Sequence, residues 1–87
     1  MNADHQLLDA WAASDQEAGQ QLVSKYFSSI CRFFRNKVGD EAEDLIQTTF
    51  LACMEAKDRF RGDSSFRTFL FSIARNVLLT HFRKRAR

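Results

Sequence analysis

The amino-acid sequence predicts an all-α fold, and three observations support that prediction. Proline is absent and glycine occurs three times in 87 residues, so few positions interrupt a helix. Apolar residues recur three and four positions apart along most of the chain, which is the spacing of one helix face. No segment of useful length alternates apolar and polar residues as a strand would. We therefore expect a compact bundle of about four helices, one short and N-terminal and three longer.

The first half of the chain predicts two of these helices. Leu7, Leu8 and Trp11 indicate a short amphipathic helix from about Asp4 to Ala13. Ser14 and Glu17 have the spacing of a capping box that starts the second helix, and Gly39 is expected to end it. The second helix carries an apolar stripe wide enough for burial against two neighbours: Leu22, Val23, Tyr26, Phe27, Ile30, Phe33 and Phe34.

A third helix is expected over residues 40–57, where Asp40 and Glu43 repeat the capping-box spacing. Leu51 is an unusual member of its polar side, although single exposed leucines are common. The predicted buried side consists of Ala42, Leu45, Ile46, Thr49, Phe50 and Cys53. The predicted exposed side consists of Asp44, Gln47, Thr48, Leu51 and Glu55.

The last helix is expected to follow a loop over residues 58–64, with Ser64 or Asp63 as its cap. The sequence HFRKRAR at the end of the chain is expected to fray into a basic tail. The apolar positions at helical spacing are Phe66, Leu70, Ile73, Ala74, Val77 and Leu78.

Charge is divided unequally along the chain. Residues 57–87 hold nine basic and two acidic residues, a formal charge of +7. Residues 1–56 hold four basic and nine acidic residues, a formal charge of −5. The overall charge of +2 therefore hides a dipolar molecule, of which one end favours a polyanion.

Composition argues against catalysis and against metal or cofactor binding. His5 and His81 lie at opposite ends of the chain, without a Cys or carboxylate at metal-ligand spacing. Cys31 and Cys53 are too far apart for a CxxC site and are interpreted as buried reduced thiols of a cytosolic protein. No apolar run approaches the ~20 residues of a membrane span. We expect a cytoplasmic binding protein with neither a membrane nor a small-molecule substrate as partner.

The basic segment interleaves arginines with phenylalanines, which supplies charge for phosphates and ring faces for bases. This combination suits single-stranded or partly melted nucleic acid better than an intact duplex. The alternative is that the rings form core: Phe66 favours that role, and Phe60 leaves the question open. A helical protein-interaction bundle without a DNA role also remains open, whereas a membrane-surface helix fits less well.

Three segments in order closely resemble region 2 of the sigma-70 family: AEDLIQTTFLA, DRFRGDSSFRTFLFSIARN and LLTHFRKR. The resemblance is nearest to the compact bacterial extracytoplasmic-function (group IV) sigma factors, and the first two expected helices share it. It implies a transcription initiation factor whose partners are RNA polymerase core, promoter DNA and an anti-sigma factor. It also implies a single region 2 domain over residues 1–87, the N-terminal part of a two-domain sigma factor whose region 4 this sequence does not include.

The resemblance assigns residues to two contacts. The third helix would dock on the clamp helices of the polymerase β′ subunit through Asp44, Gln47, Thr48 and Leu51. The loop and last helix would recognise the promoter −10 element and help to melt it by capturing flipped bases of the non-template strand. The loop residues would be Phe60, Arg61, Gly62, Asp63, Ser64 and Ser65. The helix residues would be Arg67, Thr68, Phe69, Arg75, Asn76, Thr80 and Arg83.

The sequence departs from the family pattern at several of these positions. Thr48 stands where glutamate is common, and Phe69 stands where tryptophan is usual. Ser72 and Ile73 occupy the place of the tryptophan pair with which housekeeping sigma factors wedge DNA open. Thr80 stands where an acidic or amide residue is frequent. The missing tryptophan pair implies weaker intrinsic melting and stricter promoter choice. Thr48 implies a weaker or differently made polymerase contact, and Thr80 leaves the −10 sequence preference open.

Overall fold

The computed structural model describes residues 3–60, 62 and 64–86. Its α-helices are α1 (Ala3–Ala12), α2 (Gln16–Val38), α3 (Ala42–Ala56) and α4 (Phe66–Arg85). Two 3₁₀ helices, η1 (Gly39–Glu41) and η2 (Lys57–Arg59), follow α2 and α3. The described residues contain no strand, so the prediction of an all-α fold is confirmed.

The expectation of about four separate helices is corrected by the junction between α2 and α3. The segment 16–59 is helical throughout, because η1 and η2 continue α2 and α3 without intervening coil. Counted as uninterrupted segments, the described residues form three helices, the second of them joined and long. Gly39 permits this junction because its φ of 60° is open to glycine at no steric cost. Its N–H donates to Arg35 O, so α2 ends in a turn that leads directly into α3.

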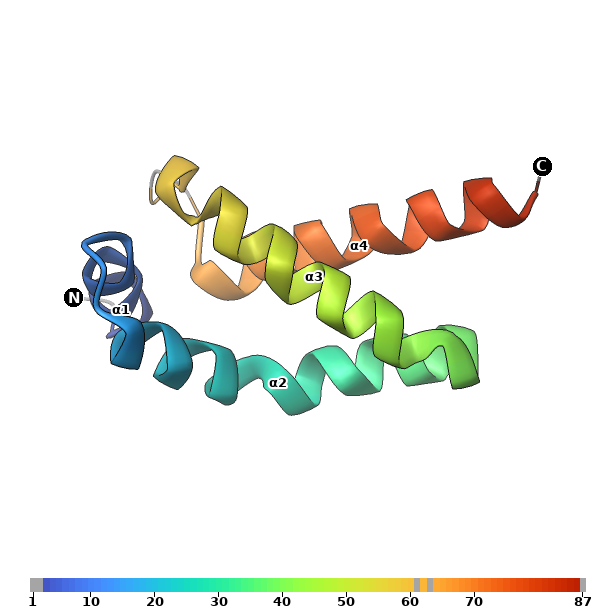
Figure 1. Ribbon diagram of the computed structural model, residues 1–87, viewed down its shortest axis with the longest axis horizontal. Coiled ribbons are helices and arrows are strands. Elements are labelled where there is room, and N and C mark those ends of the chain that lie inside the picture. Colours follow the sequence, from blue (N-terminus) through green and yellow to red (C-terminus); the bar gives the residue numbers. More distant parts are fainter. Residues whose placement is uncertain (1–2, 61, 63, 87) are drawn as a thin grey trace.

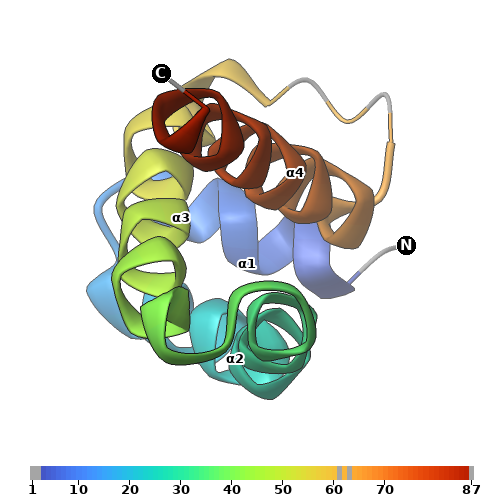
Figure 2. The ribbon, with the colours of Figure 1, turned by 90° about the vertical axis from the view of Figure 1, so that its right-hand side faces the viewer.

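The helices form an elongated bundle of about 42 × 21 × 20 Å. Figure 1 shows α2 and α4 running along the long axis, with α3 crossing beside them and α1 at the end nearest the loop. Figure 2 looks along that axis and shows α3 flanked by α2 and α4. α2 contacts α1, α3 and α4, so it is the helix on which the others assemble.

The core lies along the side of α2 that these neighbours cover. Leu22, Ile30 and Phe34 are completely buried, which confirms the predicted stripe at its centre. Phe27 lies outside the core, with 49% of its surface exposed, because it faces the edge between α2 and α3. α2 also buries Ala18 and Cys31. The buried apolar residues of the other helices are Leu8, Trp11, Ala42, Ile46, Cys53, Phe66, Leu70, Ala74 and Leu78.

The helix caps differ from those expected. Asp15 caps α2, accepting from Glu17 N and Ala18 N at 3.1 and 3.2 Å, while Ser14 takes a φ of 80° in the preceding turn. Glu41 is the cap position of α3 and makes no side-chain cap bond, so the expected Asp40–Glu43 box does not form. η1 places Asp40 inside the turn, where it cannot serve as a cap.

α4 is also capped one residue later than expected. Ser65 Oγ accepts from Thr68 N at 3.0 Å, so the expected cap Ser64 is wrong and Asp63 lies outside the described residues. The basic end of the chain continues α4 to Arg85 instead of fraying from residue 81. Glu41 holds these turns to η1, because its Oε2 accepts from His81 Nε2 at 3.0 Å and from Arg85 Nη1 at 2.8 Å.

The docking of α1 on α2 includes one close approach that requires glycine. An added Cβ at Gly19 would lie 2.5 Å from Nε1 and Cε2 of Trp11, so only glycine lets the indole reach the α2 backbone. Trp11 is 6% exposed there. Farther along the core, burial raises the pKa of the Cys53 thiol to about 11, so this cysteine stays protonated. None of the described helices is long and apolar enough to cross a membrane.

We predict that Gly19→Ala destabilises the protein by about 1–3 kcal/mol, because the new methyl group overlaps the Trp11 ring. At a helical position with no neighbour in the way, replacing glycine with alanine would instead stabilise the protein by up to ~1 kcal/mol. The sign of the change therefore shows whether the indole packs against residue 19. Urea denaturation followed by circular dichroism measures it. Gln20→Ala, at the exposed neighbouring position, is the control and should change stability little. A Gly19→Ala protein as stable as the wild type would show that the indole does not pack here.

Candidate functional site

The residues expected to bind polymerase share one exposed side of α3. Asp44, Thr48 and Leu51 recur four and three positions apart, and Gln47 lies beside them, so one partner can reach all four. Every one of the four is exposed. We call this set (Asp44, Gln47, Thr48, Leu51) the α3 ridge. Thr48 uses its hydroxyl within the helix, donating to Asp44 O at 2.8 Å, so an incoming donor meets only its lone pairs.

A largely apolar groove of about 440 Å³ runs along one flank of the α3 ridge. It lies between α2 and α3, and Gln47 and Leu51 belong to both the ridge and the groove. Three large apolar side chains at its edge are about half exposed: Phe27 at 49%, Leu51 at 51% and Met54 at 45%. The other lining residues are Val23, Cys31, Arg35, Glu43, Ile46 and Phe50. Phe27 stacks on Phe50 with ring centroids 5.9 Å apart, which fixes one wall.

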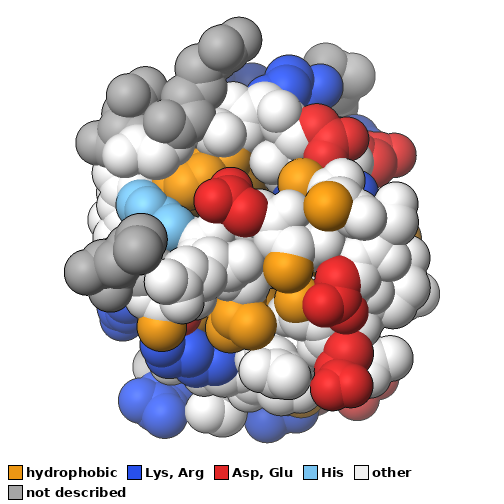
Figure 3. Space-filling view, turned by 90° about the vertical axis from the view of Figure 1, so that its left-hand side faces the viewer, with side chains coloured by type: hydrophobic (Ala, Val, Ile, Leu, Met, Phe, Trp, Pro, Cys, Tyr) orange, Lys and Arg blue, Asp and Glu red, His pale blue; other side chains and the backbone are white. Residues whose placement is uncertain are grey.

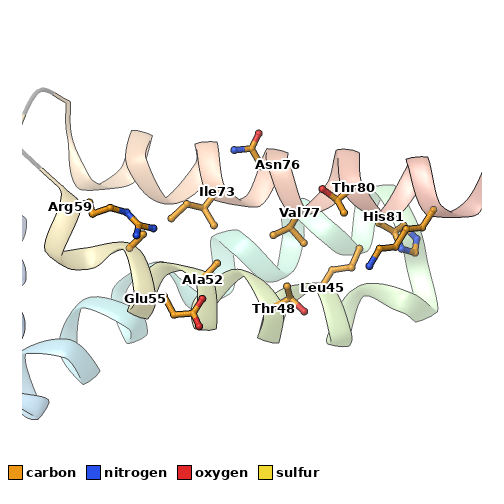
Figure 4. Close-up of a pocket in the computed structure, with 12 residues that line it drawn as sticks. Leu45, Thr48, Ala52, Glu55, Arg59, Ile73, Asn76, Val77, Thr80 and His81 are labelled. Carbon is orange, nitrogen blue, oxygen red and sulfur yellow. The ribbon is translucent and has the colours of Figure 1, made fainter.

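A second groove, of about 490 Å³, runs along the other flank between α3 and α4. Figure 4 shows Leu45 and Ala52 of α3 facing Ile73 and Val77 of α4, with Thr48 and Thr80 on the two edges. Ionisable side chains at its ends come from α3, η2 and α4: Glu55, Arg59, His81 and Lys84. The groove therefore separates the α3 ridge from the residues expected to bind DNA, while both border it.

Most of the DNA-binding candidates of α4 share one side of that helix. Asn76, Thr80 and Arg83 recur four and three positions apart, and Thr68, Phe69 and Arg75 extend the same side toward the start of α4. All are exposed except Phe69, which is half-buried. We call this set (Thr68, Phe69, Arg75, Asn76, Thr80, Arg83) the α4 face. Two arginines flanking an amide give it both phosphate and base-edge chemistry.

Arg67 does not join the α4 face. It precedes Asn76 by about two and a half helical turns and so points to the opposite side. Its guanidinium lies 4.6 Å from the centre of the Phe71 ring, and Phe71 in turn meets Phe33 of α2 edge-on at 5.7 Å. Arg67 therefore covers aromatic surface between α4 and α2.

The loop candidates are described only in part. Arg61 and Asp63 lie outside the described residues, whereas Gly62, Ser64 and Ser65 are exposed. Phe60 is half-buried and lies 5.0 Å from Phe69, ring centre to ring centre, so its ring joins the edge of the core. Phe66 is 1% exposed and belongs to the core, as favoured from the sequence.

Sequence reasoning missed a polar cluster beside this loop. Asp4 is 6% exposed on α1; its Oδ1 accepts from Lys25 Nζ at 2.7 Å and its Oδ2 from the Tyr26 hydroxyl. Burial by itself raises the pKa of the Asp4 carboxyl, but the hydrogen bonds from Lys25 and Tyr26 more than offset it, and the pKa lies below its ordinary value. The pairing joins residues 21 and 22 positions apart, which no local pattern signals.

Comparison with known proteins places residues 22–87 in the family described as Sigma-70 region 2. The RNA polymerase sigma-H factor of Pseudomonas aeruginosa is 37% identical over 86 residues, which cover 97% of this chain and 45% of that protein. The ECF RNA polymerase sigma-E factors of Salmonella typhimurium and Escherichia coli are each 33% identical over 75 residues, covering 85% of this chain and 39% of theirs. The chain therefore spans less than half the length of these curated relatives.

We predict that Asp4 stabilises the fold above about pH 4 and progressively loses that effect in acid. A carboxyl whose pKa is lower in the folded protein binds its proton more readily when unfolded. Its contribution is therefore complete above the unfolded pKa and disappears as the pH falls through the folded pKa. Asp4→Asn should cost about 1–3 kcal/mol near pH 6 and less near pH 3, measured by urea denaturation.

The control for this prediction is Asp9→Asn, which changes an exposed carboxyl of the same helix and should have little effect at either pH. A cost of Asp4→Asn that stays constant between about pH 6 and pH 3 would contradict a charge-based role.

Proposed function

Since this chain belongs to the sigma-70 region 2 family, we propose that it is the part of an extracytoplasmic-function sigma factor that joins RNA polymerase to promoter DNA. The family is one of transcription factors and not of enzymes, which agrees with the binding chemistry expected from the sequence. The observation that carries the proposal is the pair of exposed surfaces on α3 and α4. One carries half-exposed apolar residues, and the other carries arginines around an amide.

The α3 ridge and the groove beside it are the proposed polymerase contact. Phe27, Leu51 and Met54 leave about half of their surfaces in water, an arrangement typical of a surface that a partner covers. An amphipathic helix of the β′ clamp would bury these side chains in the groove, while Gln47 and Asp44 hydrogen-bond at its edge. A central apolar anchor inside a polar rim is the usual arrangement of strong protein contacts, and Leu51 is the proposed anchor.

The α4 face is the proposed contact with the −10 element. Arg75 and Arg83 are suited to phosphates, which set affinity and register, whereas Asn76 can hydrogen-bond to a base edge. An arginine that binds phosphate acts on every sequence alike, so sequence preference would come from Asn76 and the loop. Arg67, on the opposite side of α4, is left out of this contact.

Base capture is proposed for the junction between the loop and the start of α4. Phe60 and Phe69 keep part of their rings exposed next to Ser64 and Ser65. A flipped non-template base could stack on such a ring, and stacking is worth about 1–3 kcal/mol per base. Serine hydroxyls beside the ring add hydrogen-bonding groups for the edge of that base.

The rival function is a protein-interaction bundle without a DNA role, such as a domain held by an anti-sigma factor. The groove between α2 and α3 supports that function equally well, because an apolar groove accepts any suitable helix. Only the α4 face distinguishes the two functions, so variants of the α3 ridge and of the α4 face test them separately.

We predict that Leu51→Glu abolishes binding to a fragment containing the β′ clamp helices, because it puts a charge at the proposed apolar anchor. A pull-down with the purified domain measures this, and circular dichroism should be unchanged. Leu79→Glu is the matched control: Leu79 is 44% exposed on α4, and the same change there should leave clamp binding intact. Equal binding of both variants and the wild type would remove the α3 ridge from the contact.

We predict that Asn76→Ala changes which bases are preferred, whereas Arg83→Ala weakens binding to all sequences alike and lowers the salt slope by about one. Fluorescence anisotropy on single strands that vary one base at a time gives both quantities. Arg32→Ala removes the same charge from an exposed position on α2 and is the control. Uniform weakening by both α4 variants would contradict base reading by Asn76. No DNA binding by the folded wild type would favour the rival function.

A further inference from the structure

α1 touches the loop that precedes α4, although at least 55 positions of sequence separate them. His5 Nε2 lies 3.1 Å from Ser64 O; because a carbonyl oxygen only accepts, the imidazole is the donor. The same imidazole meets the Phe60 ring edge-on, with centroids 5.2 Å apart. One side chain therefore contacts the loop near its beginning and near its end. Figure 3 views this end of the molecule and shows a histidine side chain beside hydrophobic ones.

The contact continues into the core through a series of rings. Phe60 meets Phe69 at 5.0 Å, Phe69 meets Phe66 at 6.1 Å, and Phe66 meets Tyr26 at 5.7 Å. Phe66 is 1% exposed, so the series is anchored in the core. Displacing His5 would therefore remove one of the two ring contacts of Phe60, the outermost ring of the series, and leave the inner rings in place.

His5 is itself held in position from both directions along α1. Asp4, its neighbour, accepts hydrogen bonds from Lys25 and Tyr26 of α2. At the other end of α1, Trp11 packs on Gly19, and the Lys57 ammonium lies 5.5 Å from the Trp11 ring centre. α1 is thus fixed to α2 by a buried carboxylate and an indole. The imidazole projects from this fixed helix to the loop.

We propose that His5 is a positioning residue that holds Phe60 and Ser64, which lie before α4, in the arrangement used for base capture. Its consequence for DNA rests on the proposed function, because it assumes that Phe60 and the loop serines meet a flipped base. His5 acts through Ser64 O and the Phe60 ring and touches no base itself. Residues that are held in place before binding lose less entropy when a ligand arrives, so fixing Phe60 and Ser64 in advance raises affinity.

The experiment compares three variants of the full 87-residue chain with the wild type. His5→Leu removes the donor to Ser64 O, and His5→Gln keeps an N–H donor on a flexible chain. Leu7→Ala weakens the packing of the same helix without altering the imidazole, because Leu7 is a half-buried member of the core edge. Amide hydrogen exchange reports on Phe60, Ser64 and Ser65. Anisotropy reports binding to a labelled single strand of randomised sequence, and a pull-down reports binding to the β′ clamp fragment.

We expect His5→Leu to accelerate exchange in the loop but not in the buried part of α2, and to weaken single-strand binding about 3- to 10-fold. Clamp binding should be unchanged, and His5→Gln should recover most of the loss. Unchanged loop exchange in His5→Leu would overturn the proposal. The proposal would also be overturned if Leu7→Ala changed loop exchange and single-strand binding as much as His5→Leu does. Such a result would show that α1 contributes only general stability.

The result also separates this inference from the function on which it rests. A wild-type domain that binds no single strand, but whose loop exchange depends on His5, would support the positioning role and overturn the DNA-binding proposal. A wild-type domain that binds the strand with the same affinity as His5→Leu would keep the DNA-binding proposal and overturn the role of His5.

Discussion

The burial of the apolar stripe of α2 is the constraint on which the rest of the structure depends. Leu22, Ile30 and Phe34 are fully buried and contribute about 1.5–3 kcal/mol each, which together is comparable with the whole stability of a small domain. No single helix can cover a stripe of this width, so α1, α3 and α4 all pack on α2. Each of these three helices packs one of its sides against α2. The α3 ridge and the α4 face are the sides that remain.

Sequence patterns predicted these sides well, because helical periodicity separates buried from exposed positions without any knowledge of partners. On α4, Phe66, Leu70, Ala74 and Leu78 are buried at the expected spacing. The helix ends were predicted less well. Ser14 and Asp15 both offer a cap oxygen, and only the backbone conformation, with Ser14 at a φ of 80°, decides in favour of Asp15. Gly39 ends α2 as expected, but its spacing does not show that η1 then leads directly into α3.

Contacts between distant residues escaped prediction for a different reason. The approach of Trp11 to Gly19, the pairing of Asp4 with Tyr26 and the contact of His5 with Ser64 all depend on how α1 docks. Local spacing carries no signal for docking. The direction in which Arg67 points could have been predicted from helical periodicity alone, because that periodicity places it half a turn around α4 from Asn76. The family resemblance assigned both Arg67 and Asn76 to DNA because it rests on the order of motifs along the chain. That order does not show in which direction a side chain points around a helix.

The packing of α4 also limits how the charge found in the sequence can act. Arg85 belongs to the basic segment but pairs with Glu41, and Arg67 covers the Phe71 ring, so the count of +7 overstates the charge on one surface. Arg75 and Arg83 remain exposed on the α4 face, on either side of Asn76 in the sequence. Leu45 of α3 and Val77 of α4 line the floor of the groove that separates this face from the α3 ridge. Because the two helices pack directly on each other, the spacing between the proposed polymerase and promoter contacts is set by a packed interior and not by a hinge. A partner bound to the ridge would therefore hold the α4 face at a fixed position relative to itself.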